Sequence, residues 1–271
     1  MSLTWFDLFK AFALGLIEGL TELVPVSASG HLLLAQRFLG LGQENFGTTF
    51  VLMIRLGALL ALLSVYCVRL SRLAVGMFSD PAARRFVIGM LIALLPAALA
   101  GVLAHDLVRG ALFNVWLVCF VLIVGGAVLL WVDQLDRAAR HHEVARFPFA
   151  TYLVIGLAQC LALVPGVSRS GATIVAAVLL GADRRAAAEF SLWLAMPTLA
   201  GTLGYDLYHS HAGLTADNPI VWGTGFAAAF AAAWLVAKTF VDYVACHGFR
   251  LFAWWRVVVG TLGLVALAVS R

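Results

Sequence analysis

Two short polar runs, VSASGHL at residues 26–32 and PGVSRSGAT at residues 165–173, interrupt long apolar stretches of the chain. Together they contain serines, a histidine and an arginine, which are side chains that can bind anions, transfer protons or act as nucleophiles. Each run leads into an apolar helical stretch, so it presents free backbone N–H groups and the partial positive charge of a helix N-terminus. Helix N-termini of this kind bind phosphate, which makes both runs candidate anion sites.

Arg169 is the strongest candidate in this pattern. The planar guanidinium of arginine matches phosphate oxygens with two parallel hydrogen bonds, and an unpaired arginine at membrane depth is very costly. We therefore expect Arg169 to bind an anion, the alternative being a structural pairing with Glu22. Serine is also a good N-cap residue, so Ser29 and Ser170 have a purely structural interpretation as well.

Glu18 and Glu22 are four residues apart, which places them on one face of a helix upstream of the first run. Two carboxylates on one face repel each other unless a cation, a divalent metal or a shared proton lies between them. A metal or a basic partner is therefore implied, and either would suit phosphate chemistry. The structural alternative is that the glutamates form interhelical polar contacts or pair with Arg55 or Arg169.

His31 lies one residue after the first serine and glycine tip, within a turn or two of both glutamates. A lone histidine on an apolar helix is usually structural, but this setting favours a general acid, a general base or a phosphoryl acceptor. Ser27 and Ser168 are the candidate nucleophiles, because a hydroxyl beside a base can attack phosphorus. Water directed by Glu22 or His31 competes with them, and the sequence leaves this choice open.

The two polar runs belong to an internal repeat. The pattern Val-Ser-x-Ser-Gly at residues 26–30 recurs at residues 167–171, an offset of 141 residues, and at the same offset Glu18 falls on Gln159. Two copies of one unit, about residues 1–140 and 141–271, are the economical interpretation. We expect both copies to form a single integral membrane domain over residues 1–271.

Composition places this domain in a membrane. The chain is 63% hydrophobic and 12% charged, with a mean hydropathy of +0.98, which leaves too little polar surface for a soluble globule. Its net charge of +4 comes from basic residues between apolar spans, where they orient the chain, so no nucleic-acid partner is predicted. The four cysteines have no paired spacing, so neither a disulfide framework nor a zinc site is predicted.

The apolar pattern predicts an all-α polytopic fold with two kinds of element. Stretches at 8–23 and 26–38, and a second pair within 150–181, are too short to span and predict re-entrant helix hairpins with the polar runs at their tips. Three transmembrane helices follow each hairpin. They are expected at 48–68, 85–104 and 112–131, and at 189–208, 220–241 and 251–269.

An odd number of crossings separates the two hairpins, so they enter from opposite faces and their tips can meet near the midplane. This is the inverted-topology plan that places substrate sites between broken helices. Most Lys and Arg residues fall in the loops of one side, and the positive-inside rule makes that side cytoplasmic and puts both termini outside. The other side has only Lys10, Arg37, Arg109 and Arg271. Trp254 and Trp255 fit an aromatic belt near the cytoplasmic end of the last span.

The motifs EGLTELVPVSASGHL at residues 18–32 and GLAQCLALVPGVSRSGATI at residues 156–174 resemble the two signature regions of the undecaprenyl-diphosphate phosphatases of the bacitracin-resistance type. The likeness extends through most of the chain. It implies an inner-membrane enzyme that removes the terminal phosphate of undecaprenyl diphosphate, a polyprenyl lipid, and so recycles the carrier for cell-wall synthesis. It also implies dependence on a divalent cation, Mg²⁺ or Ca²⁺, and a site that opens toward the periplasm.

Carried over position by position, the resemblance implies catalytic roles for Glu18, Glu22, Ser27, His31 and Arg169, with Glu18 and Glu22 as metal ligands. The substrate-binding set comprises Ser29, Gly30, Arg55, Ser168, Arg169, Ser170, Gly171 and Thr173. Ala28 and Ser29 depart from the usual serine and threonine of the first tip, and Val51 and Arg55 stand where a glutamate and a glutamine are usual. Arg55 adds a cation, which could tighten diphosphate binding or replace a metal contact.

Two other functions fit parts of the pattern. A flippase or secondary transporter of an anionic polyprenyl lipid would use the same inverted repeats and anion-binding tips, but it needs no nucleophile. A purely structural scaffold gives no reason for so many polar groups inside the membrane. Membrane lipids are expected partners, and the glycine-bearing spans allow close helix packing, within one chain or between the subunits of a homodimer.

Overall fold

The computed structural model describes residues 4–38, 43–111, 114–135, 138–210 and 219–269, and every element named in these ranges is helical. The predicted all-α membrane architecture is confirmed. In chain order the elements are α1 (Trp5–Thr21), α2 (Ala28–Phe38), α3 (Gln43–Ser79), α4 (Pro81–Ala111), α5 (Val115–Asp133), η1 (Val144–Arg146), α6 (Phe149–Gln159), η2 (Cys160–Leu163), α7 (Arg169–Leu179), α8 (Arg184–Ser210), α9 (Pro219–His247) and α10 (Arg250–Val269).

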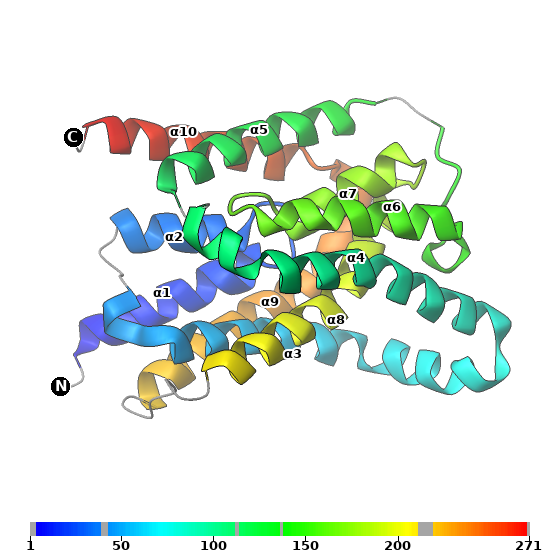
Figure 1. The fold of residues 1–271 in the computed structure, drawn as a ribbon, viewed down its shortest axis with the longest axis horizontal. Helices are drawn as coiled ribbons and strands as arrows, with labels where there is room; N and C mark the ends of the chain where they lie inside the picture. The colour runs from blue at the N-terminus through cyan, green and yellow to red at the C-terminus, as the bar shows by residue number, and fades with distance from the viewer. Residues whose placement is uncertain (1–3, 39–42, 112–113, 136–137, 211–218, 270–271) are drawn as a thin grey trace.

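The order of elements repeats, with a pair of short helices followed by three long ones in each half of the chain. The offset of 141 residues that aligns the two motifs also carries α2 onto α7 from first residue to last. Figure 1 shows that α1 and α2 reach the middle of the molecule from one end, and α6 and α7 from the other. The inverted relation of the two halves across a bilayer stays a prediction.

In the described part of the chain five helices are long and apolar enough to cross a membrane, and they correspond to five of the six predicted spans, although residues 112–113 of the span predicted at 112–131 lie outside the described residues. These helices are α3, α4, α5, α9 and α10. The sixth predicted span, 189–208, lies within α8, which has 27 residues but is less apolar than the other five. Much of α8 is buried against neighbouring helices, so its surface can be built from small and polar residues such as Ser191 and Thr198 without facing lipid.

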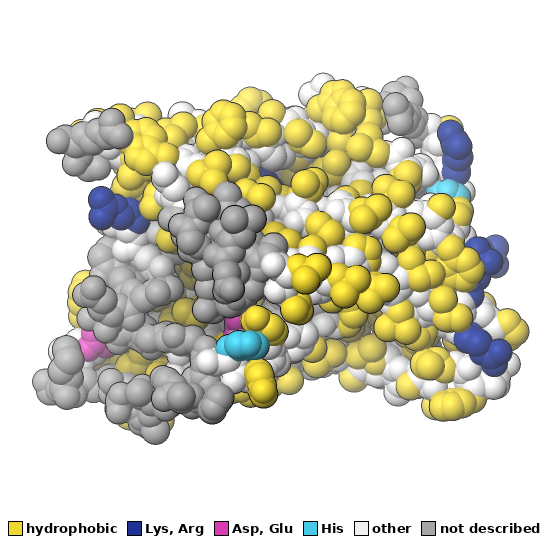
Figure 2. All heavy atoms as spheres, viewed as in Figure 1, with side chains coloured by type: hydrophobic (Ala, Val, Ile, Leu, Met, Phe, Trp, Pro, Cys, Tyr) yellow, Lys and Arg dark blue, Asp and Glu magenta, His cyan; other side chains and the backbone are white. Residues whose placement is uncertain are grey.

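Basic side chains are distributed unevenly along the molecule. Figure 2 shows most of the visible Lys and Arg side chains along the edge where α3 and α4 meet, with hydrophobic side chains over the middle. This agrees with the charge asymmetry of the sequence. Which edge is cytoplasmic stays a prediction, and Arg271 and the side chain of Arg109 lie outside the described part of the chain.

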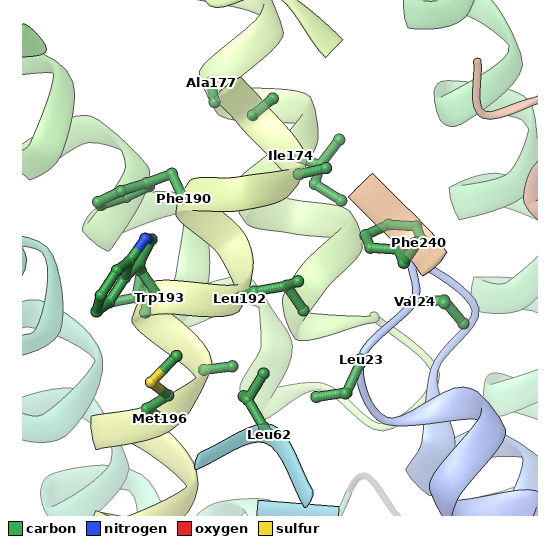
Figure 3. Packing of buried hydrophobic residues seen from close by; sticks show 14 of the residues in the cluster. Leu23, Val24, Leu62, Ile174, Ala177, Phe190, Leu192, Trp193, Met196 and Phe240 are labelled. Atoms are coloured by element: carbon green, nitrogen blue, oxygen red, sulfur yellow. The ribbon is translucent and has the colours of Figure 1, made fainter. Parts of the chain in front are cut away.

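The main hydrophobic core forms around α8. Phe190, Leu192 and Trp193 of this helix are buried, and the Trp193 ring contacts Tyr66 and Phe86 edge-on, each at 5.3 Å between centroids. Leu23 and Val24, on the loop that follows α1, belong to the same buried cluster (Figure 3). The polar run after α1 is therefore held in place by apolar anchors that pack against α8 and its neighbours.

Small residues allow α1 to lie directly against α9. A Cβ added at Gly15 would lie 2.3 Å from the carbonyl oxygen of Gly225, and one at Gly19 would lie 2.4 Å from that of Ala229. Residues four apart on both helices thus bring the two backbones together, the usual means of helix association in membranes. The glycine-bearing span around Gly225 therefore packs within the chain.

We predict that Gly19→Ala lowers the thermal unfolding temperature of the protein in detergent. The new methyl group would collide with backbone, which cannot rotate away, and overpacking of this kind costs about 1–3 kcal/mol. Gly223→Ala is the matched control, because a Cβ there meets nothing within 4 Å. The control should be neutral or slightly stabilising, since alanine favours helix by up to about 1 kcal/mol. Equal behaviour of the two variants would contradict the close packing of α1 on α9.

Candidate active site

The two polar loops at the hairpin ends contact each other in the middle of the molecule. Each polar run begins with non-helical backbone, and the name tip is used below for this backbone alone. The first tip is residues 22–27 and the second tip is residues 164–168. The hydroxyl of Ser170, just after the second tip, donates to the carbonyl oxygen of Val24 at 2.7 Å, and the Ser168 hydroxyl lies 2.9 Å from that of Ser170. Two motifs separated by 141 residues of chain thus meet, as the hairpin arrangement predicts.

Arg169 is the first residue of α7 and extends toward the first tip. Its Nη2 donates at 3.3 Å both to a carboxylate oxygen and to the backbone carbonyl of Glu22. Its Nε and Nη1 are buried and have no hydrogen-bond partner. Buried donors without a partner are costly, so the site has two donor nitrogens, beside the N-terminus of a helix, that an anion would satisfy.

Glu18 lies deeper in the protein and is 1% exposed. Its nearest cation is Arg55, whose Nε is 4.0 Å from one carboxylate oxygen, and neither oxygen of Glu18 accepts a hydrogen bond. Arg55 also binds Asp206 of α8, with 3.2 Å between Nη1 and the carboxylate. The sequence predicts a metal or a basic partner for the two glutamates. In the structure each glutamate has a basic neighbour, Arg55 for Glu18 and Arg169 for Glu22. Asp206 was not among the predicted site residues.

Ser27 and His31 form a strained corner at the start of α2. Ser27 has a φ of +76°, which residues other than glycine adopt at a cost of about 1–2 kcal/mol. Its carbonyl accepts from Nδ1 of His31 at 2.8 Å, and its hydroxyl accepts from the backbone N–H of Gly30 at 3.4 Å. The other ring nitrogen of His31 accepts from the indole N–H of Trp255 at 2.7 Å. The two ring nitrogens thus bind a backbone carbonyl and an indole, and neither contacts the Ser27 hydroxyl or a glutamate.

Comparison with known proteins identifies the family. A family model described as "Bacitracin resistance protein BacA" matches residues 11–262. The undecaprenyl-diphosphatase of Rhodopseudomonas palustris strain BisB18 is 58% identical over 265 residues, which is 98% of this chain and 99% of the relative. Those of Afipia carboxidovorans and Nitrobacter winogradskyi are 58% and 56% identical over the same shares. The chain belongs to the BacA family.

The remaining polar residues that the sequence assigns to the site of this BacA-family protein mainly join its parts. The sequence offers Ser29 and Ser170 as N-caps, but the N-cap of α7 is Ser168, whose hydroxyl accepts from the N–H of Gly171 at 3.1 Å. The Thr173 hydroxyl lies 3.0 Å from that of Ser191 on α8. Ser29, by contrast, is exposed.

Arg256 of α10 is a component of the BacA-family site that the sequence reasoning missed. Its side chain is buried, and its guanidinium donates to the carbonyl of Pro25 in the first tip at 3.1 Å and to that of Gly166 in the second tip at 3.0 Å. It also reaches the carbonyl of Leu122 on α5 at 3.4 Å. In the described part of the chain Arg256 forms no ion pair. An arginine inside an otherwise apolar span was the available signal.

We predict that Arg256→Met destabilises the protein by about 2 kcal/mol or more, because each buried carbonyl left without a donor costs about 1–3 kcal/mol. Thermal unfolding in detergent measures this change. Arg185→Met is the control, since Arg185 pairs with Asp242 at an exposed position, where an ion pair contributes about 0–1 kcal/mol. If both variants unfold at the wild-type temperature, Arg256 does not hold the tips together.

Proposed function

We propose that this protein hydrolyses the terminal phosphoanhydride of undecaprenyl diphosphate, giving undecaprenyl phosphate and phosphate. The observation that supports this most directly is the pair of buried, unpartnered donor nitrogens of Arg169 beside Glu22, at the N-terminus of α7. Such a fork suits the oxygens of a phosphoryl group. The relatives with 56–58% identity, which are named undecaprenyl-diphosphatases, indicate which phosphorylated substrate it would be.

Diphosphate binding would centre on Arg169 and the backbone amides of both tips. Ser168, Ser170 and Thr173 would fix the second tip, while the exposed Ser29 is free to reach substrate. Gly30 and Gly171 leave room where the tips meet, since a Cβ at Gly30 would lie 3.5 Å from Cα of Gly166 in the second tip, and one at Gly171 would lie 3.2 Å from the Arg256 guanidinium that joins the tips. Arg55, already near Glu18, adds a second cation to the binding set.

The residues present fit a divalent cation, Mg²⁺ or Ca²⁺, at Glu18 and Glu22. Both oxygens of Glu18 are buried without a hydrogen bond, and such an atom is a natural ligand for a hard cation. Glu22 gives one oxygen to Arg169 and keeps the other for a second contact. No cluster of three His, Cys, Asp or Glu residues occurs among the described residues, so substrate oxygens and water would complete the set. A bound cation would neutralise charge on the diphosphate.

For the chemical step, the oxygen of Ser27 or of a water directed by Glu22 would attack the terminal phosphorus. The bond from phosphorus to the bridging oxygen breaks, and undecaprenyl phosphate leaves. Attack by Ser27 would leave a phosphoserine that water then hydrolyses. Ser168 is the weaker candidate, because its hydroxyl caps α7. Glu22 would take up the proton of the attacking group, while His31 would hold Ser27 in place by donating from Nδ1 to the Ser27 carbonyl.

We place the protein in the bacterial inner membrane with several crossings, both termini outside and the site opening toward the periplasm. Substrate tails would lie between helices and enter sideways from the bilayer, and a homodimer is compatible with this arrangement. The two halves would form inverted repeats around the tips. The relatives bear a phosphatase name, so a flippase or transporter as the sole activity is not favoured.

Arg169→Lys and Arg169→Ala should each lower phosphate release from undecaprenyl diphosphate by about a hundredfold or more, the usual effect of losing a transition-state donor. Lysine keeps the charge but lacks the fork, so it should not restore the rate. Arg185→Ala, at an exposed ion pair, is the control and should match the wild type. Wild-type rates from a folded Arg169→Ala protein would refute the assignment.

EDTA should abolish phosphate release, and Mg²⁺ or Ca²⁺ should restore it. Glu18→Gln should then raise the metal concentration needed for half-maximal rate by about tenfold or more, because an amide is a poorer ligand than a carboxylate. Asp183→Asn is a suitable control, since Asp183 binds His142 and caps α8 away from the tips. An unchanged metal requirement in Glu18→Gln would exclude Glu18 as a ligand, whatever the overall rate.

A further inference from the structure

The hydrogen bonds of His31 determine which of its nitrogens carries the proton. Nδ1 lies 2.8 Å from the carbonyl oxygen of Ser27, and a carbonyl can only accept, so Nδ1 bears the hydrogen. Nε2 lies 2.7 Å from the indole nitrogen of Trp255, and an indole can only donate, so Nε2 presents its lone pair. The ring is therefore the neutral Nδ1–H tautomer, and both of its nitrogens are occupied.

Trp255 reaches this position from α10, more than 200 residues along the chain from His31. The two rings lie nearly parallel, with 8° between their planes and 6.1 Å between centroids. The neighbouring Trp254 is 57% exposed and Trp255 is 52% exposed, so the two indole rings differ little in exposure and only the Trp255 indole is bonded to His31. The sequence predicts that both tryptophans lie in an aromatic belt. In the structure the indole N–H of Trp255 is instead bonded to a residue of the site. Arg256, the next residue, binds both tips, so α10 contacts the site through two adjacent side chains.

We propose that Trp255 is a positioning residue of the site, whose indole N–H fixes the tautomer and the orientation of the His31 ring and, through Nδ1 of that ring, the position of Ser27. The lone pair of Nε2 has a single direction, and the hydrogen bond from the indole occupies it, so this nitrogen is not open to a proton from another group. The same bond fixes the ring, which in turn holds the carbonyl of Ser27 in its left-handed conformation. This role rests on the proposed function, although the hydrogen bond itself can be tested without turnover.

The hydrogen bond is tested by ¹⁵N NMR of histidine-labelled protein in detergent, with the His31 signals assigned from their loss in His31→Gln. In Trp255→Phe the Nε2 resonance should move downfield, toward that of an imine nitrogen that accepts no hydrogen bond, while Nδ1 stays protonated. Trp254→Phe removes an exposed indole from the same helix and should leave both resonances unchanged. An Nε2 resonance that does not move in Trp255→Phe would overturn the proposal.

The catalytic consequence is tested by phosphate release from undecaprenyl diphosphate. Trp255→Phe should lower kcat by roughly tenfold with little change in KM, since a misplaced Ser27 slows the chemical step and not binding. In a His31→Gln background the same substitution should have little further effect, because the two residues act as one unit. Equal effects in both backgrounds would mean that Trp255 acts independently of His31 and would refute the proposal.

Misfolding is controlled by a second variant in which benzothienylalanine replaces Trp255, since sulfur removes the N–H donor and keeps the ring shape. It should reproduce both results of Trp255→Phe, and wild-type behaviour would contradict the proposal. The two readouts also separate the two hypotheses. An active wild-type enzyme with an unmoved Nε2 resonance defeats only the role of Trp255, whereas an inactive wild type with the expected shift defeats only the proposed phosphatase function.

Discussion

The hydrogen bonds from Arg256 to the carbonyls of Pro25 and Gly166 are the contact on which the site depends. Both tips are non-helical, so their carbonyls lack the partners that a helix provides. Away from water such backbone must be satisfied by other protein groups. Arg256 serves one carbonyl of each tip, and Ser170 and Arg169 serve those of Val24 and Glu22. A single buried guanidinium thereby joins two hairpins that enter from opposite ends of the molecule.

The buried atoms without hydrogen-bond partners support the proposed ligand of the site. In the described part of the chain the buried, unbonded side-chain atoms are two donors of Arg169, both oxygens of Glu18, and one oxygen of Gln159. Gln159 is the repeat counterpart of Glu18, so the two unsatisfied acceptor positions are related by the internal duplication. The described residues thus keep both positively charged donors on Arg169 and carboxylate oxygens on Glu18 without hydrogen-bond partners. A diphosphate carrying a divalent cation would satisfy both kinds, whereas a simple anion would satisfy only Arg169.

The sequence was enough to locate the polar residues of the two tips and the glutamate pair. It was not enough to identify Asp206 and Arg256, whose roles depend on contacts with distant parts of the chain. Serines, glycines and Arg169 inside apolar sequence predicted the tips, and the four-residue spacing of Glu18 and Glu22 predicted a need for cations. Asp206 and Arg256 were passed over because each lies within a stretch that was read as a plain span. The acceptors of Arg256 are backbone carbonyls, which leave no residue signature, and the burial of much of α8 by other helices is invisible in one sequence.

The two copies of the Val-Ser-x-Ser-Gly motif have diverged in backbone conformation, and this separates their roles. Ser168 has a φ of −71° and caps α7 in the ordinary way, so the second tip is a relaxed helix N-terminus suited to holding an anion. Ser27, its counterpart, has a φ of +76° and is held by His31, which is held in turn by Trp255. Backbone strain persists only where surrounding contacts enforce it, and it concentrates at functional sites. The chain thus applies one motif twice, once relaxed for binding and once strained where the attacking group would lie.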